Sequence, residues 1–231
     1  MEQALTHKQR TRARILDEAA GAMRTFGIDG IGVAALMKRA GLTQGGFYAH
    51  FASRDDLVAH TIDRMFEDSK AMVSRHLDGQ PPAEGLATLI DAYLSDRARL
   101  TPERTCPIPS ISSEASRLPG PARARFNQGV ERFEKAIADR LAALGNDAAE
   151  ATAVSVLAEM IGTMTLARSI DDDGKASAML KVSRERLKID LGYNLFDILE
   201  VVSDQEFWGR DGLFSQVRPA FSDIDTMRHC S

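Results

Sequence analysis

Aromatic residues, cysteines and long apolar runs are all scarce in this chain of 231 residues. Aromatics make up 6% of it, and its two cysteines, Cys106 and Cys230, are far apart. Because the N-terminal MEQALTHKQRTRAR lacks the apolar core of a signal peptide, we expect both cysteines to be reduced thiols in a cytoplasmic protein. The most apolar stretch, residues 152–167, is interrupted by Glu159. It falls short of the roughly 18 uncharged residues that would suggest a membrane span.

Catalytic and metal-binding patterns are also missing. The five histidines show no metal-ligand spacing, and no Gly-x-Ser-x-Gly or Ser-His-Asp arrangement is legible. DDDGK at 171–175 lacks the alternating aspartates of a calcium loop and is expected to cap a helix instead. We therefore expect no catalytic residues, no metal and no cofactor. A helical enzyme or small-molecule carrier stays open as the alternative, and it would need convergent polar groups that the sequence does not display.

Strand patterns are few, whereas Ala, Leu, Arg and Glu dominate, and this composition predicts an all-α fold. The formal net charge of −4 is unevenly distributed along the sequence. Residues 1–54 hold eight Lys and Arg against four Asp and Glu, and the remainder holds 21 against 29. A basic end on an acidic body suggests that the N-terminal segment meets a polyanion, although windows of this size also differ by chance.

The basic end begins with a predicted amphipathic helix, for which Gly27 is the expected C-terminal cap. Its apolar residues recur at helical spacing: Ile15, Leu16, Ala19, Met23 and Phe26. Its opening turns contain four cations and no acid: Lys8, Arg10, Arg12 and Arg14. Cations at this end oppose the helix macrodipole, and an external anion would compensate them. A frayed, solvated start is the ordinary alternative.

Residues 31–50 predict a helix-turn-helix. A short helix at 33–39 is followed by Gly41 at a turn that needs a positive φ, and Thr43 is expected to cap a second short helix with its hydroxyl. Gly45 and Gly46 fall in the first turn of that helix and leave its exposed end bare. Because no strand precedes them and no Gly-Lys-Ser/Thr follows, a phosphate loop is excluded. We expect DNA to approach this backbone instead.

The residues after the glycine pair are expected to divide between core and surface. Phe47 and Phe51, four apart, should point onto the first helix, while Tyr48 and His50 flank the exposed surface. Ser53, followed three residues later by an aspartate, has the form of a capping box that opens a long helix. The later helices are predicted at about 54–76, 83–100, 111–117, 121–144, 147–170 and 175–191.

The segment TRARILDEAAGAMRTFGIDGIGVAALMKRAGLTQGGFYAHFASRDDLV, residues 11–58, resembles the TetR family of bacterial transcriptional regulators. The residues in register are Ala40, Gly41, Leu42, Thr43, Gly45, Tyr48, Phe51, Ser53, Arg54 and Leu57. Gly32 departs from the pattern, because the family usually has a capping threonine there. The resemblance implies a TetR-type helix-turn-helix DNA-binding domain at 8–68, with its helix-turn-helix at 31–50. A larger helical effector-binding and dimerisation domain would follow at 69–192, and an extension at 193–231.

The resemblance also implies the residues that bind DNA. Phosphate contacts are expected from Thr43, Tyr48, His50, Arg54 and, as a further candidate, Lys38. Gln44 could pair with the N6 and N7 atoms of adenine, and Gly45 and Gly46 would pack closely against the bases. The protein would then be a homodimer that binds a double-stranded DNA operator and responds to a small-molecule effector, more as a repressor than as an activator. A pure protein-interaction module would not explain the basic helix-turn-helix.

Finally, the resemblance implies a dimer made by the last two helices and an effector pocket in the larger domain. Small residues such as Ala153 and Ala167 suggest close packing of the 147–170 helix in the dimer, with an internal buried helix as the alternative. The candidates for lining the pocket are Met65, Phe66, Met72, Tyr93, Phe126, Phe133, Met160 and Met164, and plain core packing is the alternative for each. Cys106 is a candidate redox or electrophile sensor, although a packed, protonated thiol is favoured.

Overall fold

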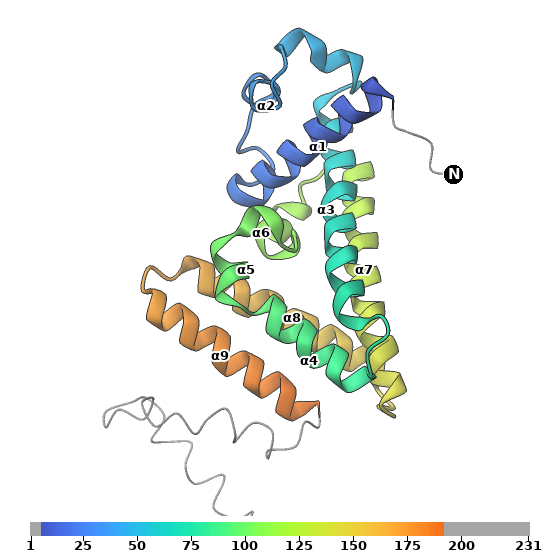
Figure 1. Ribbon diagram of the computed structural model, residues 1–231, viewed down its shortest axis with the longest axis vertical. Helices are drawn as coiled ribbons and strands as arrows, with labels where there is room; N and C mark the ends of the chain where they lie inside the picture. Colours follow the sequence, from blue (N-terminus) through green and yellow to red (C-terminus); the bar gives the residue numbers. More distant parts are fainter. Residues whose placement is uncertain (1–5, 192–231) are drawn as a thin grey trace, which may run out of the picture. The chain divides into compact units, whose positions relative to one another are not determined.

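The computed structural model, shown in Figure 1, describes residues 6–191. The extension expected at 193–231, with Cys230, lies outside the described residues. Within residues 6–191 the chain forms helices and no strands, which confirms the all-α fold. The helices are α1 (His7–Phe26), α2 (Val33–Arg39), η1 (Gln44–Ala49), α3 (Arg54–Leu77), α4 (Pro82–Tyr93), α5 (Asp96–Leu100), η2 (Pro102–Arg104), α6 (Ile108–Ala115), α7 (Gly120–Ala143), α8 (Ala149–Ser169) and α9 (Asp173–Asp190). None of the helices in this part of the chain is long and apolar enough to cross a membrane.

The N-terminal elements fold around a small hydrophobic cluster of their own. Phe47 and Phe51 are 1% and 2% exposed, and they belong to one cluster with Ile15 and Leu16 of α1 and Leu36 of α2. Both phenylalanines therefore turn onto the first helix, as predicted. This apolar contact is what holds the short η1 helix in place, because six residues of helix are not stable in isolation.

The turn between α2 and η1 is a Schellman motif. Gly41 has a φ of +67°, and the next N–H, that of Leu42, donates to the carbonyl of Met37 at 2.8 Å. The second helix of the motif differs from the prediction in two respects. It is a 3₁₀ helix, in which the Gly46 N–H donates to the Thr43 carbonyl at 3.1 Å, and the Thr43 hydroxyl makes no capping hydrogen bond. The i→i+3 pattern closes the turn without that hydroxyl.

The larger body is a stack of long helices that α3 enters from the DNA-binding end. α3 packs along α7, α7 packs on α8, α8 packs on α9, and α4 contacts α3, α7 and α9 (Figure 1). The approach of α3 to α7 requires Gly129, because a Cβ atom there would come within 2.4 Å of the Phe66 ring. One hydrophobic core runs through this body, from Ala20 of α1 to Leu187 of α9.

The helix predicted at 83–100 is interrupted. α4 ends at Tyr93, and Ser95 starts the separate helix α5 by accepting the Ala98 N–H at 3.2 Å. The chain bends at Leu94, whose side chain is fully buried. As a result, α5 leads into η2, which contacts α1. The helical period alone did not reveal this break, because apolar residues continue through it.

Other helix starts follow the predicted capping in part. Ser53 accepts the Asp56 N–H at 3.1 Å, whereas the Asp56 carboxylate accepts the N–H of Ala52 rather than that of Ser53. The capping box is therefore incomplete. At the start of α9, Asp172 accepts the Lys175 N–H at 3.0 Å, so the DDDG segment serves as a helix cap, as predicted.

Candidate DNA-binding surface and effector cavity

The side chains expected to meet DNA remain free of the core. Lys38, Thr43, Gln44 and Tyr48 are exposed, and Tyr48 is 78% exposed although it is a large aromatic residue. Its ring packs edge-on against buried Phe47, with the ring centroids 5.2 Å apart. α2 and η1 are in contact, so these side chains belong to one compact surface of the helix-turn-helix.

The glycine pair is not required by the packing of the chain itself. A Cβ atom at Gly45 would meet nothing within 4 Å, and one at Gly46 would meet only Met37 Cε at 3.7 Å and Thr43 Oγ1 at 3.9 Å, which are ordinary contacts. Neither glycine has a positive φ, unlike Gly41. Gly45 and Gly46 are therefore needed neither for a left-handed backbone conformation nor for close packing within residues 6–191.

The basic start of α1 lies beside the end of η1. The Arg12 guanidinium stacks over the Phe51 ring, with its Cζ atom 4.8 Å from the ring centroid. Burial, together with the positive charges of Lys8, Arg12 and His7, lowers the pKa of His50. The Nδ1 atom of His50 is buried without a hydrogen-bond partner. The patch defined by His7, Lys8, Arg12 and His50 is called the basic patch below.

Helix α1 is well ordered at this end by a capping box. Thr6 Oγ1 accepts the Gln9 N–H at 3.3 Å, and Gln9 Oε1 accepts the Thr6 N–H at 2.7 Å. The first turn contains no acidic residue. The sequence analysis noted Lys8 and Arg12 and the lack of an acid beside them, but it did not include them in the candidate site. Their proximity to His50 and Phe51 is a tertiary contact, which the sequence did not reveal.

Arg54 differs from the other candidates because part of its guanidinium is already used. Its Nη2 atom donates to the Ile28 carbonyl at 2.8 Å and pairs with Asp29 Oδ1 at 2.8 Å. These contacts hold the loop between α1 and α2 onto the start of α3. The side chain is still 38% exposed, and the other N–H groups of its guanidinium are available to an external anion.

The expected pocket residues separate into three groups. Met72, Tyr93 and Met164 line a cavity of about 80 Å³ that also touches Cys106 and Arg168, and we call it the Tyr93 cavity. Phe66 and Phe133 line a second hollow of about 300 Å³ between α3 and α7. Three further candidates are buried in the core and line neither of these two cavities: Met65, Phe126 and Met160.

Cys106 is 3% exposed, and burial raises the pKa of its thiol. A protonated, enclosed thiol is a poor nucleophile, because reactivity requires the thiolate and access to it. Its surroundings therefore agree with the packed thiol that the sequence favoured. No group of His, Cys, Asp and Glu within residues 6–191 could hold a metal ion.

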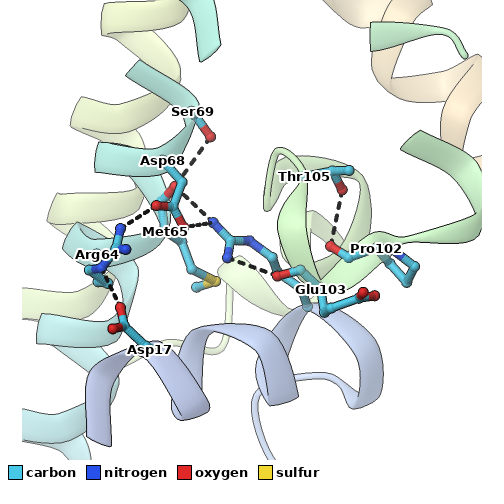
Figure 2. A network of polar contacts seen from close by, with 9 residues as sticks. Asp17, Arg64, Met65, Asp68, Ser69, Pro102, Glu103 and Thr105 are labelled. Atoms are coloured by element: carbon cyan, nitrogen blue, oxygen red, sulfur yellow. Dashed lines mark hydrogen bonds and ion pairs between the residues drawn. The ribbon is translucent and has the colours of Figure 1, made fainter. Parts of the chain in front are cut away.

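A polar network connects the Tyr93 cavity with helix α1. Asp68, at the edge of the cavity, accepts from Arg24 of α1 at 2.9 Å, and Arg24 also donates to the carbonyls of Met65 at 3.0 Å and Glu103 at 3.2 Å. Figure 2 shows Asp68 and Met65 on α3 facing Glu103 across this network. Arg24 is thus a buried cation held jointly by α3 and η2.

The fold and this surface define a helical DNA-binding protein with a helix-turn-helix at its N-terminal end. Residues 15–61 match the family model of bacterial regulatory proteins, tetR family. This match identifies residues 15–61 as a DNA-binding domain of the tetR family, which confirms the resemblance seen in the sequence.

Solved structures of similar fold extend over most of the chain. A TetR-family transcriptional regulator from Agrobacterium tumefaciens has a TM-score of 0.68 at 21% identity, covering 78% of this chain and 98% of that one. One from Cytophaga hutchinsonii has a TM-score of 0.69 at 18% identity, covering 81% and 98%. The reduced form of E. coli NemR has a TM-score of 0.68 at 16% identity, covering 78% and 96%. At such identities the likeness concerns the fold. A comparison with curated proteins finds no match.

Proposed function

We propose that this protein is a homodimeric transcriptional repressor that leaves its DNA operator when a small molecule binds the larger domain. The proposed DNA binding rests on Gly45 and Gly46 of η1. These two glycines lie between exposed polar side chains and close to the basic patch. Nothing within residues 6–191 requires bare backbone there, and a DNA groove is a partner that does.

We assign the contacts as follows. Gln44, exposed at the first position of η1, reads a base through its amide. The basic patch and the exposed Thr43 and Tyr48 bind phosphates, and Lys38 and the remaining N–H groups of Arg54 add to them. Gly45 and Gly46 let the backbone approach the base edges. Phosphate contacts position the protein, whereas Gln44 and the close approach contribute sequence preference.

Dimerisation is proposed through the outer faces of α8 and α9. Large apolar side chains are exposed on both helices: Val154, Leu166, Val182 and Ile189. An exposed apolar surface shared by two adjacent helices is typical of a protein interface. Ala153 and Ala167, by contrast, are fully buried within their own chain, so the sequence-based choice of these two alanines as dimer contacts was wrong. Periodicity identified the helix but not its outer face.

Ligand response is supported by the connection between cavity and DNA-binding end. Arg24 bonds α1 to α3 and η2 at once, so a ligand that moves η2 changes how α1 is held. Helix α1 contributes His7, Lys8 and Arg12 of the basic patch and the packing surface of η1. A small rotation of α1 in each protomer would change the separation of the two recognition helices, which must match half-sites about 34–36 Å apart.

Selection of bound sites from random double-stranded DNA by the full chain tests this function. We expect an enriched palindrome with two half-sites. Gln44→Ala should relax the preference at one base pair per half-site, at a cost of about 1–3 kcal/mol. Gln128→Ala, at an exposed position of α7, is the matched control and should recover the parental site. A helical enzyme or carrier without DNA binding would enrich no sequence.

A further inference from the structure

Arg168 of α8 is a half-buried cation without a carboxylate partner. Its Nη2 atom donates to the Ala98 carbonyl at 2.9 Å and to Thr105 Oγ1 at 2.8 Å, and its Nη1 atom donates to Ser110 Oγ at 3.1 Å. Three of the five guanidinium N–H groups are thereby used, all on neutral oxygens. The Nε atom is buried and has no partner. Burial lowers the pKa of this group, against the raising effect of Tyr93, Cys106 and Glu103.

The two buried arginines of residues 6–191 are paired with acids, whereas Arg168 is half-buried. Arg24 has Asp68 at 2.9 Å, and Arg99 has Asp96 at 3.0 Å and Asp173 at 2.8 Å. Arg168 alone among these three has no acid within ion-pair distance in residues 6–191. Even a half-buried charge without a counter-charge is unfavourable, so the position of Arg168 beside a cavity favours an anionic partner from outside the chain.

A second orphan group shares the same cavity. The Tyr93 hydroxyl makes no hydrogen bond of normal geometry, and its residue is 5% exposed. Burial raises the pKa of this hydroxyl, and the neighbouring Cys106 thiol adds to that effect. The ring is held by an edge contact with Phe133, with ring centroids 5.9 Å apart. Tyr93 and Arg168 both line the Tyr93 cavity. A buried hydroxyl normally finds a partner, and the space beside it is where that partner would sit.

The charge around the cavity favours an anion. Arg104, whose side chain is exposed, lines it together with Arg168. The acid on its wall is Asp68, and that carboxylate is already shared by Arg24 and Arg64. The volume of about 80 Å³ is well below the roughly 300–1,000 Å³ of pockets for drug-sized ligands. Met72 and Met164 supply an apolar wall.

We propose that the Tyr93 cavity binds a small organic carboxylate, with its oxygens on Arg168 and the Tyr93 hydroxyl and a short apolar group against Met72 and Met164. The role of this carboxylate as the effector rests on the proposed function above. Hydrogen bonds connect the cavity with η2: Arg168 donates to the Thr105 hydroxyl, which donates to the Pro102 carbonyl at 3.0 Å. Figure 2 shows Thr105, Pro102 and Glu103 on the loop that faces Asp68.

Calorimetric titration of the full chain, without DNA, tests the site. The ligands are sodium acetate, propionate and butyrate, each compared with its neutral amide at constant ionic strength. We expect saturable binding of one or more carboxylates and none of the amides. Tyr93→Phe should weaken binding about three- to tenfold, the net worth of one hydrogen bond. Arg168→Gln should weaken it more than tenfold. Arg123→Gln, at an exposed position of α7 outside the cavity, should leave it unchanged.

Methyl resonances of ¹³C-labelled methionine locate the ligand independently of any variant. The signals of Met72 and Met164 should shift on titration, whereas that of Met37, in the helix-turn-helix cluster, should not. Absence of saturable binding by the parent overturns the proposal, and so does equal binding of the amides. Unchanged affinity in Tyr93→Phe or unshifted Met72 and Met164 signals would place the carboxylate elsewhere and overturn it as well.

Measuring release from the operator distinguishes carboxylate binding in the Tyr93 cavity from a role of that cavity as the effector site. On the selected operator, release of Tyr93→Phe should require a carboxylate concentration about three to ten times that which releases the parent. Binding without release would confirm the anion site and refute its role as the effector site. Failure of the parent to select any DNA would refute the proposed function while the titration still decides the site.

Discussion

Replacing Gly45 by glutamate tests why the recognition helix begins with bare backbone. A side chain there meets open space within the chain, since nothing lies within 4 Å of the added Cβ, and φ is not positive. The folded protein should therefore be unharmed. Replacing glycine in a helix raises the free energy of unfolding by up to about 1 kcal/mol, so we expect a melting temperature equal to or above that of the parent.

DNA binding should respond in the opposite direction. A carboxylate at an assumed distance of about 7 Å from a phosphate costs roughly 0.6–2.4 kcal/mol, for effective dielectric constants of about 80 to 20. A dimer places one such charge on each half-site, so the cost doubles. Since 1.4 kcal/mol corresponds to a factor of ten, operator affinity should fall roughly tenfold to a few thousandfold, before any steric clash with the bases is added.

Gly120→Glu is the matched control. Gly120 begins α7, is exposed, and also has nothing within 4 Å of an added Cβ. Thermal unfolding and fluorescence anisotropy on the selected operator measure both quantities for all three proteins. If Gly45→Glu melts well below Gly120→Glu, the glycine serves the backbone rather than DNA. If Gly45→Glu has the melting temperature of the parent and binds the operator with parental affinity, η1 does not face the DNA groove.

Arg54→Ala should weaken binding to all DNA sequences and lower the salt slope by about one unit; a lower melting temperature with an unchanged slope would limit Arg54 to anchoring the loop. Burial and the neighbouring cations lower the pKa of His50 in the free protein, whereas a bound phosphate would favour its protonated form. Operator affinity should therefore rise as the pH falls through the range in which histidine titrates, in the parent but not in His50→Gln. With its folded-state pKa below 6.5, the imidazole contributes stability above that pH and loses it as the pH falls, because the unfolded chain takes up the proton first. Leu166→Glu should yield monomers in sedimentation and lose operator affinity, whereas Leu100→Glu, equally exposed but on α5, should stay dimeric. Cys106→Ser should retain operator binding and effector release; release of the parent alone by peroxide would make the buried thiol a sensor after all.

Local sequence determined the elements of this fold. Period-3.6 apolar residues, Gly41 at its positive φ and the Asp172 cap each act over a few neighbouring residues, and such signals are legible along the chain. The same holds for the orientation of Phe47 and Phe51, four apart on one face. The helix-turn-helix and its family could therefore be read before any coordinates.

Tertiary contacts decided what surrounds those elements. The basic start of α1 meets η1 only because Phe51 packs under Arg12, and Ala153 turned inward because α8 is apolar around much of its circumference, so its pattern did not mark an outer face. The unpaired Arg168 is the extreme case. Its hydrogen bonds to Ala98 and Thr105 span 70 and 63 residues of sequence. Whether a charge has a counter-charge depends on the whole set of residues folded around it, and no local pattern encodes that.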